Sequence, residues 1–486
     1  YLTAALRISA LAVGDEDAVA TSVTHPVRVD LTQDGRMEGL PLGTRGGIEV
    51  RHNFPADADY VLSGRLLKGV LEGYKGVEGH ETPHEFLILV DGVEVYSAMI
   101  GGEDDHAIST ENVTQSFFSI DPRMTSPAIP ITAGPHDVAF TWRARQSIDQ
   151  SVWQPALAAS GDPHNTSGMP RLRTVSIEGP YEVSGISATP SRERLMVCEP
   201  ASESEEAACA EEIVETLARR AFRRAVSETD VQEPLAFYND ARERGGNFNS
   251  GIQAAVARIL VSPSFLFRSE QDPADLPGGS SHEISDVELA SRLSFFLWSS
   301  IPDDELLDHA TAGRLQDPEV LESQVRRMVA DDRAAAFVEN FTGQWLQLRN
   351  HEQRVVPDAS IFPDFDDNLR KAFRTETEML FASVLHEDRS VLDLLRADYT
   401  FVNDRLARHY GIPGVYGTRF RRVDVTDPNR QGLLGHGSLL SLTSASTRTS
   451  PIIRGTFVVS NLMNSPPPEP PAAVPALEES APTDRP

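Results

Sequence analysis

The residues best suited to hold a ligand lie near the end of the chain, where Thr447-Arg448-Thr449-Ser450-Pro451 is followed by Arg454. Two guanidinium groups six residues apart and flanked by hydroxyl groups can grip a carboxylate or a haem propionate through paired hydrogen bonds. In an acidic, arginine-rich chain, such arginines also tie loops to neighbouring carboxylates. The sequence therefore makes Arg448, Ser450 and Arg454 candidate ligand contacts and leaves the second interpretation open.

Four further candidates lie upstream, in a region with helical periodicity: Trp345, Glu376, His409 and Tyr410. His409 can ligate iron or zinc, but a histidine near the end of a helix also satisfies the last carbonyl groups of that helix. Gly411 follows and ends the predicted helix, so both roles of His409 stay open. We treat all four residues as candidate ligand or haem contacts.

Acidic residues around the predicted Asp91-Gly92 turn offer oxygen ligands for Ca²⁺. The calcium candidates are Asp91, Glu103, Asp104 and Asp105. Their spacing follows no calcium-loop pattern, so a solvated acidic loop is the alternative interpretation.

The stretch His80-Glu81-Thr82-Pro83-His84 has the letters of the zinc-protease motif. That chemistry needs both imidazoles on one face of a helix, with the glutamate placed as a base. Pro83 would break such a helix, and a strand-like segment follows directly. We therefore expect a surface loop here and assign no metal site.

The chain has two cysteines, Cys198 and Cys209, in an acidic, alanine-rich segment. Their spacing fits neither a zinc knuckle nor a Cys-x-x-Cys redox pair. An even count and close spacing predict one disulfide and an oxidising compartment, with two unrelated buried thiols as the alternative.

The composition is strongly acidic, with 72 Asp and Glu against 44 Lys and Arg and a net charge of −28. Such a chain repels phosphate backbones, so we expect no nucleic-acid partner. Apolar stretches are too short for a membrane helix, and no Walker loop, dinucleotide-binding glycine motif, nucleophile elbow or Cys-x-x-Cys-His haem motif occurs. The chain starts at Tyr1 with no visible signal peptide, so we expect it to be processed or part of a longer polypeptide.

The hydrophobic pattern changes along the chain and predicts a multidomain α+β protein. After a helical segment over 1–13, alternation predicts strands at 47–50, 60–66, 85–90, 93–98, 137–142 and 173–178, which together suggest a β-sandwich. Period-3.6 patterns then predict helices at 207–224, 251–261, 287–298, 318–330, 333–348, 365–386, 391–395 and 403–409. Ser285 and Glu288 form the capping box of the third of these helices.

Five segments follow from this pattern. They are a β-sandwich over 1–185, a Cys-bridged linker over 186–210, a mainly helical domain over 211–414, a mixed α/β segment over 415–465 and a Pro-rich linker over 466–486. The sandwich is a candidate carbohydrate-binding module if Trp142 and Trp153 stack on sugar rings from its surface. Trp142 buried in the sandwich core is the alternative.

Ordered sequence blocks in the second half resemble the planctomycete cytochrome c-associated proteins, which are built from serial domains of unknown function. The resemblance covers about 190–486. It rests on Cys198-Glu199-Pro200, Cys209-Ala210, Ser262-Pro263-Ser264-Phe265-Leu266-Phe267-Arg268, Ser294-Phe295-Phe296-Leu297-Trp298, Gln344-Trp345-Leu346, Tyr399-Thr400-Phe401-Val402-Asn403, Arg408-His409-Tyr410-Gly411, Arg448-Thr449-Ser450-Pro451 and the prolines of 466–471.

The resemblance implies an exported, periplasmic or extracellular protein whose c-type haem groups lie in flanking regions, with no cofactor attached within these residues. It implies c-type cytochrome domains or proteins as partners and a role in electron transfer. We therefore expect the non-haem body of a c-type cytochrome-associated oxidoreductase of the cell envelope, acting on polysaccharide or another polymer. The alternative is a non-catalytic glycan-binding or scaffold protein of the envelope or of an extracellular assembly.

Overall fold

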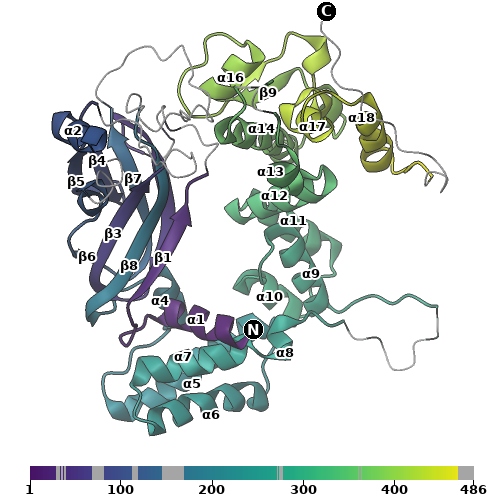
Figure 1. Ribbon diagram of the computed structural model, residues 1–486. Coiled ribbons are helices and arrows are strands. Elements are labelled where there is room, and N and C mark those ends of the chain that lie inside the picture. Colours follow the sequence, from purple (N-terminus) through teal and green to yellow (C-terminus); the bar gives the residue numbers. More distant parts are fainter. Residues whose placement is uncertain are drawn as a thin grey trace, which may run out of the picture.

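The computed structural model comprises a β-rich part and a helical part, which lie on opposite sides in Figure 1. The structure describes residues 1–28, 33, 37, 40–67, 81–111, 119–144, 169–270, 272, 277, 279–358, 361–362 and 364–468. His80, Trp153 and most of the predicted Pro-rich linker lie outside the described residues. The α+β organisation predicted from the sequence is confirmed.

Two antiparallel four-stranded sheets form the β-rich part. The first has the order β1 (Thr21–Pro26), β8 (Leu172–Gly185), β3 (Asp57–Leu66), β6 (Ile129–Ile131). The second has the order β2 (Thr44–Phe54), β7 (Gly134–Arg143), β4 (His84–Val90), β5 (Val93–Ile100). Asp91 and Gly92 both have positive φ, as the tight turn between β4 and β5 requires.

Side chains from both sheets share one hydrophobic core, which includes Leu62, Phe86, Phe140 and Ile177. Trp142 belongs to this core and is fully buried, with its ring 5.3 Å from that of Phe86. Of the two interpretations of Trp142, burial in the sandwich core is therefore correct, and stacking on sugars at the surface is not. Trp142 lies on the face of β7 that packs against the other sheet, between buried Thr141 and exposed Arg143, and its large apolar surface is more stable inside the sandwich.

A helical bundle follows the sandwich along the chain. Its helices are α5 (Glu203–Phe222), α6 (Glu228–Glu243) and α7 (Phe248–Leu260), with the short α4 (Pro190–Leu195) and α8 (Pro263–Leu266) on either side. Helix α1 (Leu2–Val13), confirmed as helical, packs against α7 and contributes Val13 to the bundle core. Helix α6 was not predicted from the pattern, because Pro234 lies inside it.

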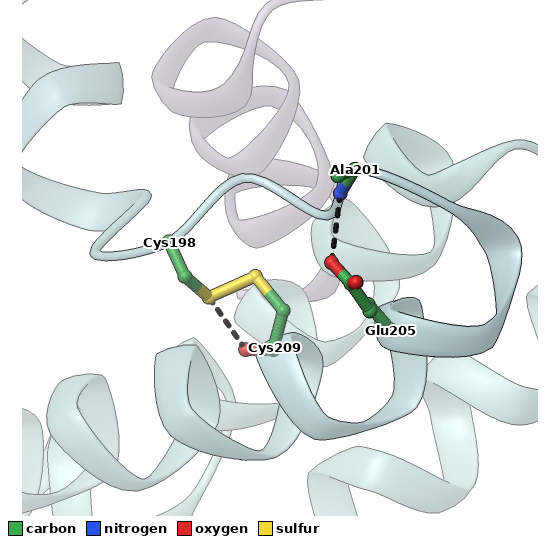
Figure 2. Close-up of a disulfide and its surroundings, with 4 residues drawn as sticks. All are labelled: Cys198, Ala201, Glu205 and Cys209. Atoms are coloured by element: carbon green, nitrogen blue, oxygen red, sulfur yellow. Dashed lines mark hydrogen bonds between the residues drawn. A yellow bond between two sulfur atoms is a disulfide. The ribbon is translucent and has the colours of Figure 1, made fainter.

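The predicted disulfide between Cys198 and Cys209 is confirmed (Figure 2). The two Cα atoms are 5.8 Å apart. Cys209 lies inside α5, and the backbone N–H of Ala201 donates to Glu205 across the same turn of chain. The segment predicted as a linker therefore contains α4 and the first turns of α5. The disulfide links the residues between α4 and α5 to α5 itself.

The remaining helices rise from the bundle along the side opposite the sandwich (Figure 1). They are α9 (Asp286–Trp298), α10 (Asp304–Thr311), α11 (Pro318–Ala330), α12 (Ala335–Trp345), α13 (His351–Arg354) and α14 (Asp367–His386). The capping box of Ser285 and Glu288 at the start of α9 is confirmed.

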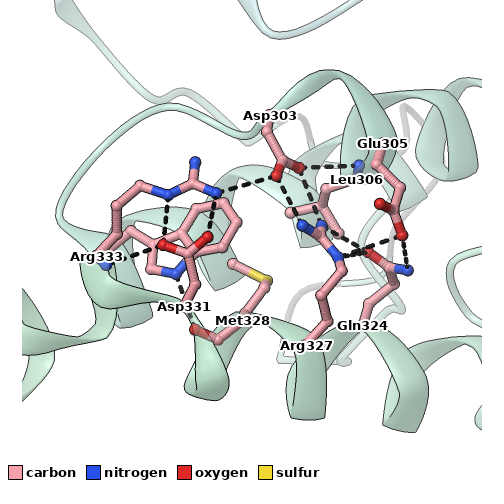
Figure 3. Close-up of polar contacts among 9 residues, drawn as sticks. Asp303, Glu305, Leu306, Gln324, Arg327, Met328, Asp331 and Arg333 are labelled. Atoms are coloured by element: carbon pink, nitrogen blue, oxygen red, sulfur yellow. Dashed lines mark hydrogen bonds and ion pairs between the residues drawn. The ribbon is translucent and has the colours of Figure 1, made fainter.

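An ion-pair network joins α10, α11 and the residues after α11 (Figure 3). Asp303 caps α10 by accepting a hydrogen bond from the backbone N–H of Leu306, and it also receives Arg327 at 2.7 Å and Arg333 at 3.2 Å. The guanidinium of Arg333 lies 3.5 Å from the centre of the Trp298 ring. One carboxylate thus holds three consecutive segments together.

The chain ends in a mixed region over α14. It contains α15 (Asp393–Arg396), a two-stranded sheet of β9 (Tyr399–Val402) and β10 (Arg421–Asp424), and the helices α16 (Asp404–Tyr410), α17 (Gly437–Leu442) and α18 (Pro451–Phe457). No described helix is long and apolar enough to span a membrane. The division into five segments stays a prediction.

Candidate functional site

A cavity of about 520 Å³ lies between α13, α14, α16, α17 and α18. Its walls are mainly apolar, with side chains from the 355–373 stretch and from α17. The apolar lining is Val355, Val356, Pro357, Ile361, Phe362, Phe365, Leu369, Phe373, Leu440 and Ala445. A cavity of this size and character is typical of sites for small molecules.

Four arginines line the same cavity: Arg354, Arg430, Arg448 and Arg454. Arg454 donates to the hydroxyl of Thr443 at 3.2 Å and to the carbonyl of Leu440 at 3.3 Å. No described carboxylate forms an ion pair with any of the four arginines. The second interpretation of Arg448 and Arg454, a tie to neighbouring carboxylates, is therefore not what the described contacts show.

Local backbone structure places Arg448 and Arg454 at the cavity. The carbonyl of Arg448 accepts from the N–H of Ala445 at 2.8 Å, which closes a tight turn after α17. Ser450 caps α18 by accepting from the N–H of Ile453. This cap sets the start of α18 and so the direction in which the side chain of Arg454 projects from the helix. Ser450 therefore positions a neighbouring arginine, and its own hydroxyl is used by the helix end.

Tyr410 forms part of the cavity wall, and its hydroxyl is bound to Glu376 beneath it. Glu376 is 1 % exposed and also accepts from Thr400 at 2.7 Å. Burial, and next the charge of Glu376, raises the pKa of Tyr410 well above its usual value. Tyr410 is thus held protonated, as a hydrogen-bond donor to a buried carboxylate.

His409 also lines the cavity, and its ring lies 5.3 Å from that of Phe373. Desolvation by the cavity wall, followed by the charges of Arg405 and Arg430, lowers the pKa of His409. A neutral imidazole at the cavity wall retains a nitrogen lone pair that can accept a hydrogen bond or bind a metal.

A second histidine, His436, precedes the lining residue Gly437 and is fully buried. Its Nδ1 is 3.0 Å from the hydroxyl of Thr377, and its Nε2 is 3.9 Å from Glu376. Burial lowers the pKa of His436, while Glu376 acts in the opposite direction. Arg354 and Arg430 were not among the predicted site residues, because no local motif marks them and only the fold brings them to the cavity. His436 was not predicted either; it is not part of the lining but precedes the lining residue Gly437.

Trp345 lies outside the cavity lining. Its indole N–H donates to the carbonyl of Asn461 at 3.0 Å, and the side-chain amide of Asn461 returns a bond of 2.8 Å to the carbonyl of Trp345. Trp345 therefore fastens the C-terminal segment to α12. Of the predicted candidates, the cavity brings together Arg448, Arg454, His409 and Tyr410, with Glu376 directly behind them.

The four calcium candidates do not lie together at one site. Asp91 precedes β5 and bonds His136, whereas Glu103, Asp104 and Asp105 follow the other end of that strand. Asp105 is already bound to Arg123 at 2.5 Å. Among the residues that the structure describes, no group of three His, Cys, Asp or Glu is arranged to hold a metal ion.

His84 lies on β4 and is buried, so its side chain cannot take part in a helical zinc motif. Its ring nitrogens approach Arg45 at 3.4 Å and Thr82 at 3.0 Å. The expectation that this stretch does not form the zinc-protease helix agrees with the described part, which begins at Glu81.

Three family models match the chain in series. Residues 209–270 match PSD5, Protein of unknown function (DUF1595), and residues 284–412 match PSD4, Protein of unknown function (DUF1592). Residues 430–485 match PSCyt3, Protein of unknown function (DUF1588). No curated protein matches the chain. The cavity is built by the second and third of these matched regions together.

Proposed function

The chain belongs to the planctomycete cytochrome c-associated family, and from this premise we propose that it is the non-haem body of an exported c-type cytochrome-associated oxidoreductase of the cell envelope. The proposal includes c-type haem in flanking regions and a polysaccharide or another polymer as the substrate. The disulfide supports an oxidising compartment, because disulfides are rare in reducing ones.

The observation that carries the proposal is the arginine-lined cavity. Four guanidinium groups without described carboxylate partners surround apolar walls in a chain of net charge −28. This combination fits the propionate edge of a haem carried by a cytochrome domain, since guanidinium groups bind carboxylates and apolar walls receive the ring. Arg448 and Arg454 would hold the propionates. When bound, the haem would supply one-electron transfer.

The test uses the full-length protein purified from the envelope fraction of its own host. We expect a c-type haem spectrum that persists after denaturation, because the haem is covalently attached. Arg448→Gln combined with Arg454→Gln should shift the haem midpoint potential, whereas Arg244→Gln, on the exposed end of α6, should not. A full-length protein without haem would refute the redox proposal.

The alternative is a glycan-binding or scaffold protein. It loses one supporting observation, because Trp142 is buried and cannot stack on a sugar. It predicts retention on immobilised envelope polysaccharide with no haem present. Retention by the isolated chain together with a haem-free full-length protein would favour this alternative.

A further inference from the structure

A second cavity, also of about 520 Å³, lies between the end of α5, the residues after α8 and the first turns of α9. It shares no lining residue with the cavity described above. It lies between the two matched regions 209–270 and 284–412. Its lining is predominantly polar and includes four arginines: Arg223, Arg224, Arg268 and Arg292.

Two of these arginines are neutralised by carboxylates. Arg224 pairs with Asp230 at 2.7 Å, and Arg292 pairs with Glu270 at 2.5 Å. Both pairs have two parallel N–H···O bonds, the strong form of this interaction. The positive charges of Arg224 and Arg292 are thus largely neutralised by carboxylates of the protein itself.

The other two arginines have no carboxylate partner among the described residues. Arg223 is 5 % exposed and donates only to backbone carbonyls, those of Ala221, Ser264, Phe265 and Phe267. Arg268 lies over the ring of Phe295, with its guanidinium carbon 4.4 Å from the ring centre, and Arg223 is 5.9 Å from the same centre. The ring of Phe295 thus lies close to two positive charges that have no carboxylate partner among the described residues.

The electrostatic cost of this arrangement is visible at Arg223. Burial, followed by the positive charges of Arg268 and Arg224, lowers the pKa of its guanidinium. Glu288, the remaining acidic residue of the lining, accepts from the N–H and hydroxyl of Ser285 at 2.8 Å to close the capping box of α9. The cavity therefore retains net positive charge.

Four serines also belong to the lining: Ser264, Ser269, Ser285 and Ser291. Ser291 is 9 % exposed, and its hydroxyl has no hydrogen-bond partner within the described part of the chain. A buried hydroxyl without a partner is uncommon, because losing its bonds to water is costly. An oxyanion would satisfy such a hydroxyl, and it would also balance the positive charge of Arg223 and Arg268, which have no carboxylate partner among the described residues.

We propose that this cavity binds a phosphate or sulfate group, either as the free ion or as part of a small organic molecule. A tetrahedral oxyanion presents oxygens in several directions, which matches donors that come from α5, from the residues after α8 and from α9. The cavity volume lies within the roughly 300–1,000 Å³ of small-molecule sites. This site is independent of the arginine-lined cavity and of the proposed redox function.

The test is calorimetric titration of the whole chain with inorganic phosphate, inorganic sulfate, glucose 6-phosphate and glucose 6-sulfate at constant ionic strength. Acetate and chloride serve as reference anions. We expect at least one phosphate or sulfate probe to bind at least tenfold more tightly than acetate. Tighter binding of the sugar esters would identify a small organic ligand, and tighter binding of the inorganic ions a free ion.

Arg268→Gln should weaken that binding at least tenfold, because it removes an exposed positive charge of the lining that makes no described ion pair. Arg268→Lys should retain part of the affinity. The control Arg244→Gln, which removes an exposed arginine directly after α6, should bind as the unchanged protein does. Equal binding of all anions, or an Arg268→Gln protein that binds normally and is folded by circular dichroism, would overturn the proposal.

Discussion

Tyr410 donates a hydrogen bond to Glu376, with 2.6 Å between Oη and Oε2. The same hydroxyl oxygen accepts from the backbone N–H of Gly437 at 2.8 Å, so it joins α16, α14 and α17 at one point. The guanidinium of Arg430 lies 3.6 Å from the centre of the Tyr410 ring. Tyr410, which forms part of the wall of the arginine-lined cavity, is therefore held in place by the buried Glu376 carboxylate, and Glu376 accepts hydrogen bonds from both Tyr410 and Thr400.

Tyr410→Phe should lower the free energy of unfolding by about 1–3 kcal/mol, because it leaves the Glu376 carboxylate and the Gly437 N–H short of a partner. Urea denaturation followed by circular dichroism would measure the change. Tyr416→Phe is the matched control, since Tyr416 is 77 % exposed and its loss should have little effect. Equal effects of the two substitutions would contradict the structural role of Tyr410.

Stability should depend on pH through His351, which is 1 % exposed. Burial, and next the charges of Arg370 and Arg374, lowers its pKa from 6.5 to about 4. The unfolded chain therefore binds more protons than the folded protein between these values, so the free energy of unfolding falls as the pH drops from 6.5 towards 4. The loss from this group is on the order of 3 kcal/mol.

His351→Asn should flatten that part of the stability profile, measured by urea denaturation at intervals between pH 4 and 7. His386→Asn provides the control, because His386 is an exposed residue in the last turn of α14. If both variants kept the slope of the unchanged protein, His351 would not be its source.

Asp303→Ala should cost about 1–3 kcal/mol, because it removes the cap of α10 and leaves Arg327 and Arg333 without a shared carboxylate (Figure 3). Glu322→Ala removes an exposed pair with Arg326 on α11 and should change stability by no more than about 0.5 kcal/mol. Thermal denaturation of both variants would compare them, and a loss for Glu322→Ala as large as for Asp303→Ala would argue against the network.

Replacing both cysteines by serine should lower stability by about 2–3 kcal/mol, the chain-entropy value for a short loop. Unfolding in the presence and absence of dithiothreitol would check this, because reduction of the unchanged protein should produce the same loss. Reductant should have no effect on the double variant. Mass spectrometry of the non-reduced protein should recover Cys198 and Cys209 in one linked peptide pair.

Local patterns predicted the elements well where one strong signal dominates. The box of Ser285 and Glu288 fixed the start of α9, and the Asp91-Gly92 turn fixed the β4–β5 hairpin. Strand β1 was missed because its sequence is largely polar and exposed, and it is held by pairing with β8 far along the chain. Alternation along one segment cannot show such a distant partner.

The candidate site was predicted only in part. Arg448 and Arg454 stood out because they are close in sequence, and both line the cavity. Arg430, from the turn at Pro428–Arg430, also lines the cavity, and His436, which precedes the lining residue Gly437 in sequence, bonds Thr377 of α14. No spacing rule encodes this packing. The sequence could not show whether Trp142 is buried or exposed, because an aromatic residue in a strand can face either side of the sheet with the same local pattern.

The packing of α1 has a consequence for how the polypeptide can be divided. The carbonyl of Val13 accepts from Arg192, the carbonyl of Gly14 accepts from Gln253, and Glu16 binds Asn247. The described strands β1 to β8 are thus an insertion in the sequence between α1 and the other helices of the bundle. A fragment that begins at Cys198 would lack α1 and its contribution to the bundle core. A variant in which a short linker joins Gly14 directly to the start of α4, in place of the strands, should retain all helices of the bundle and fold.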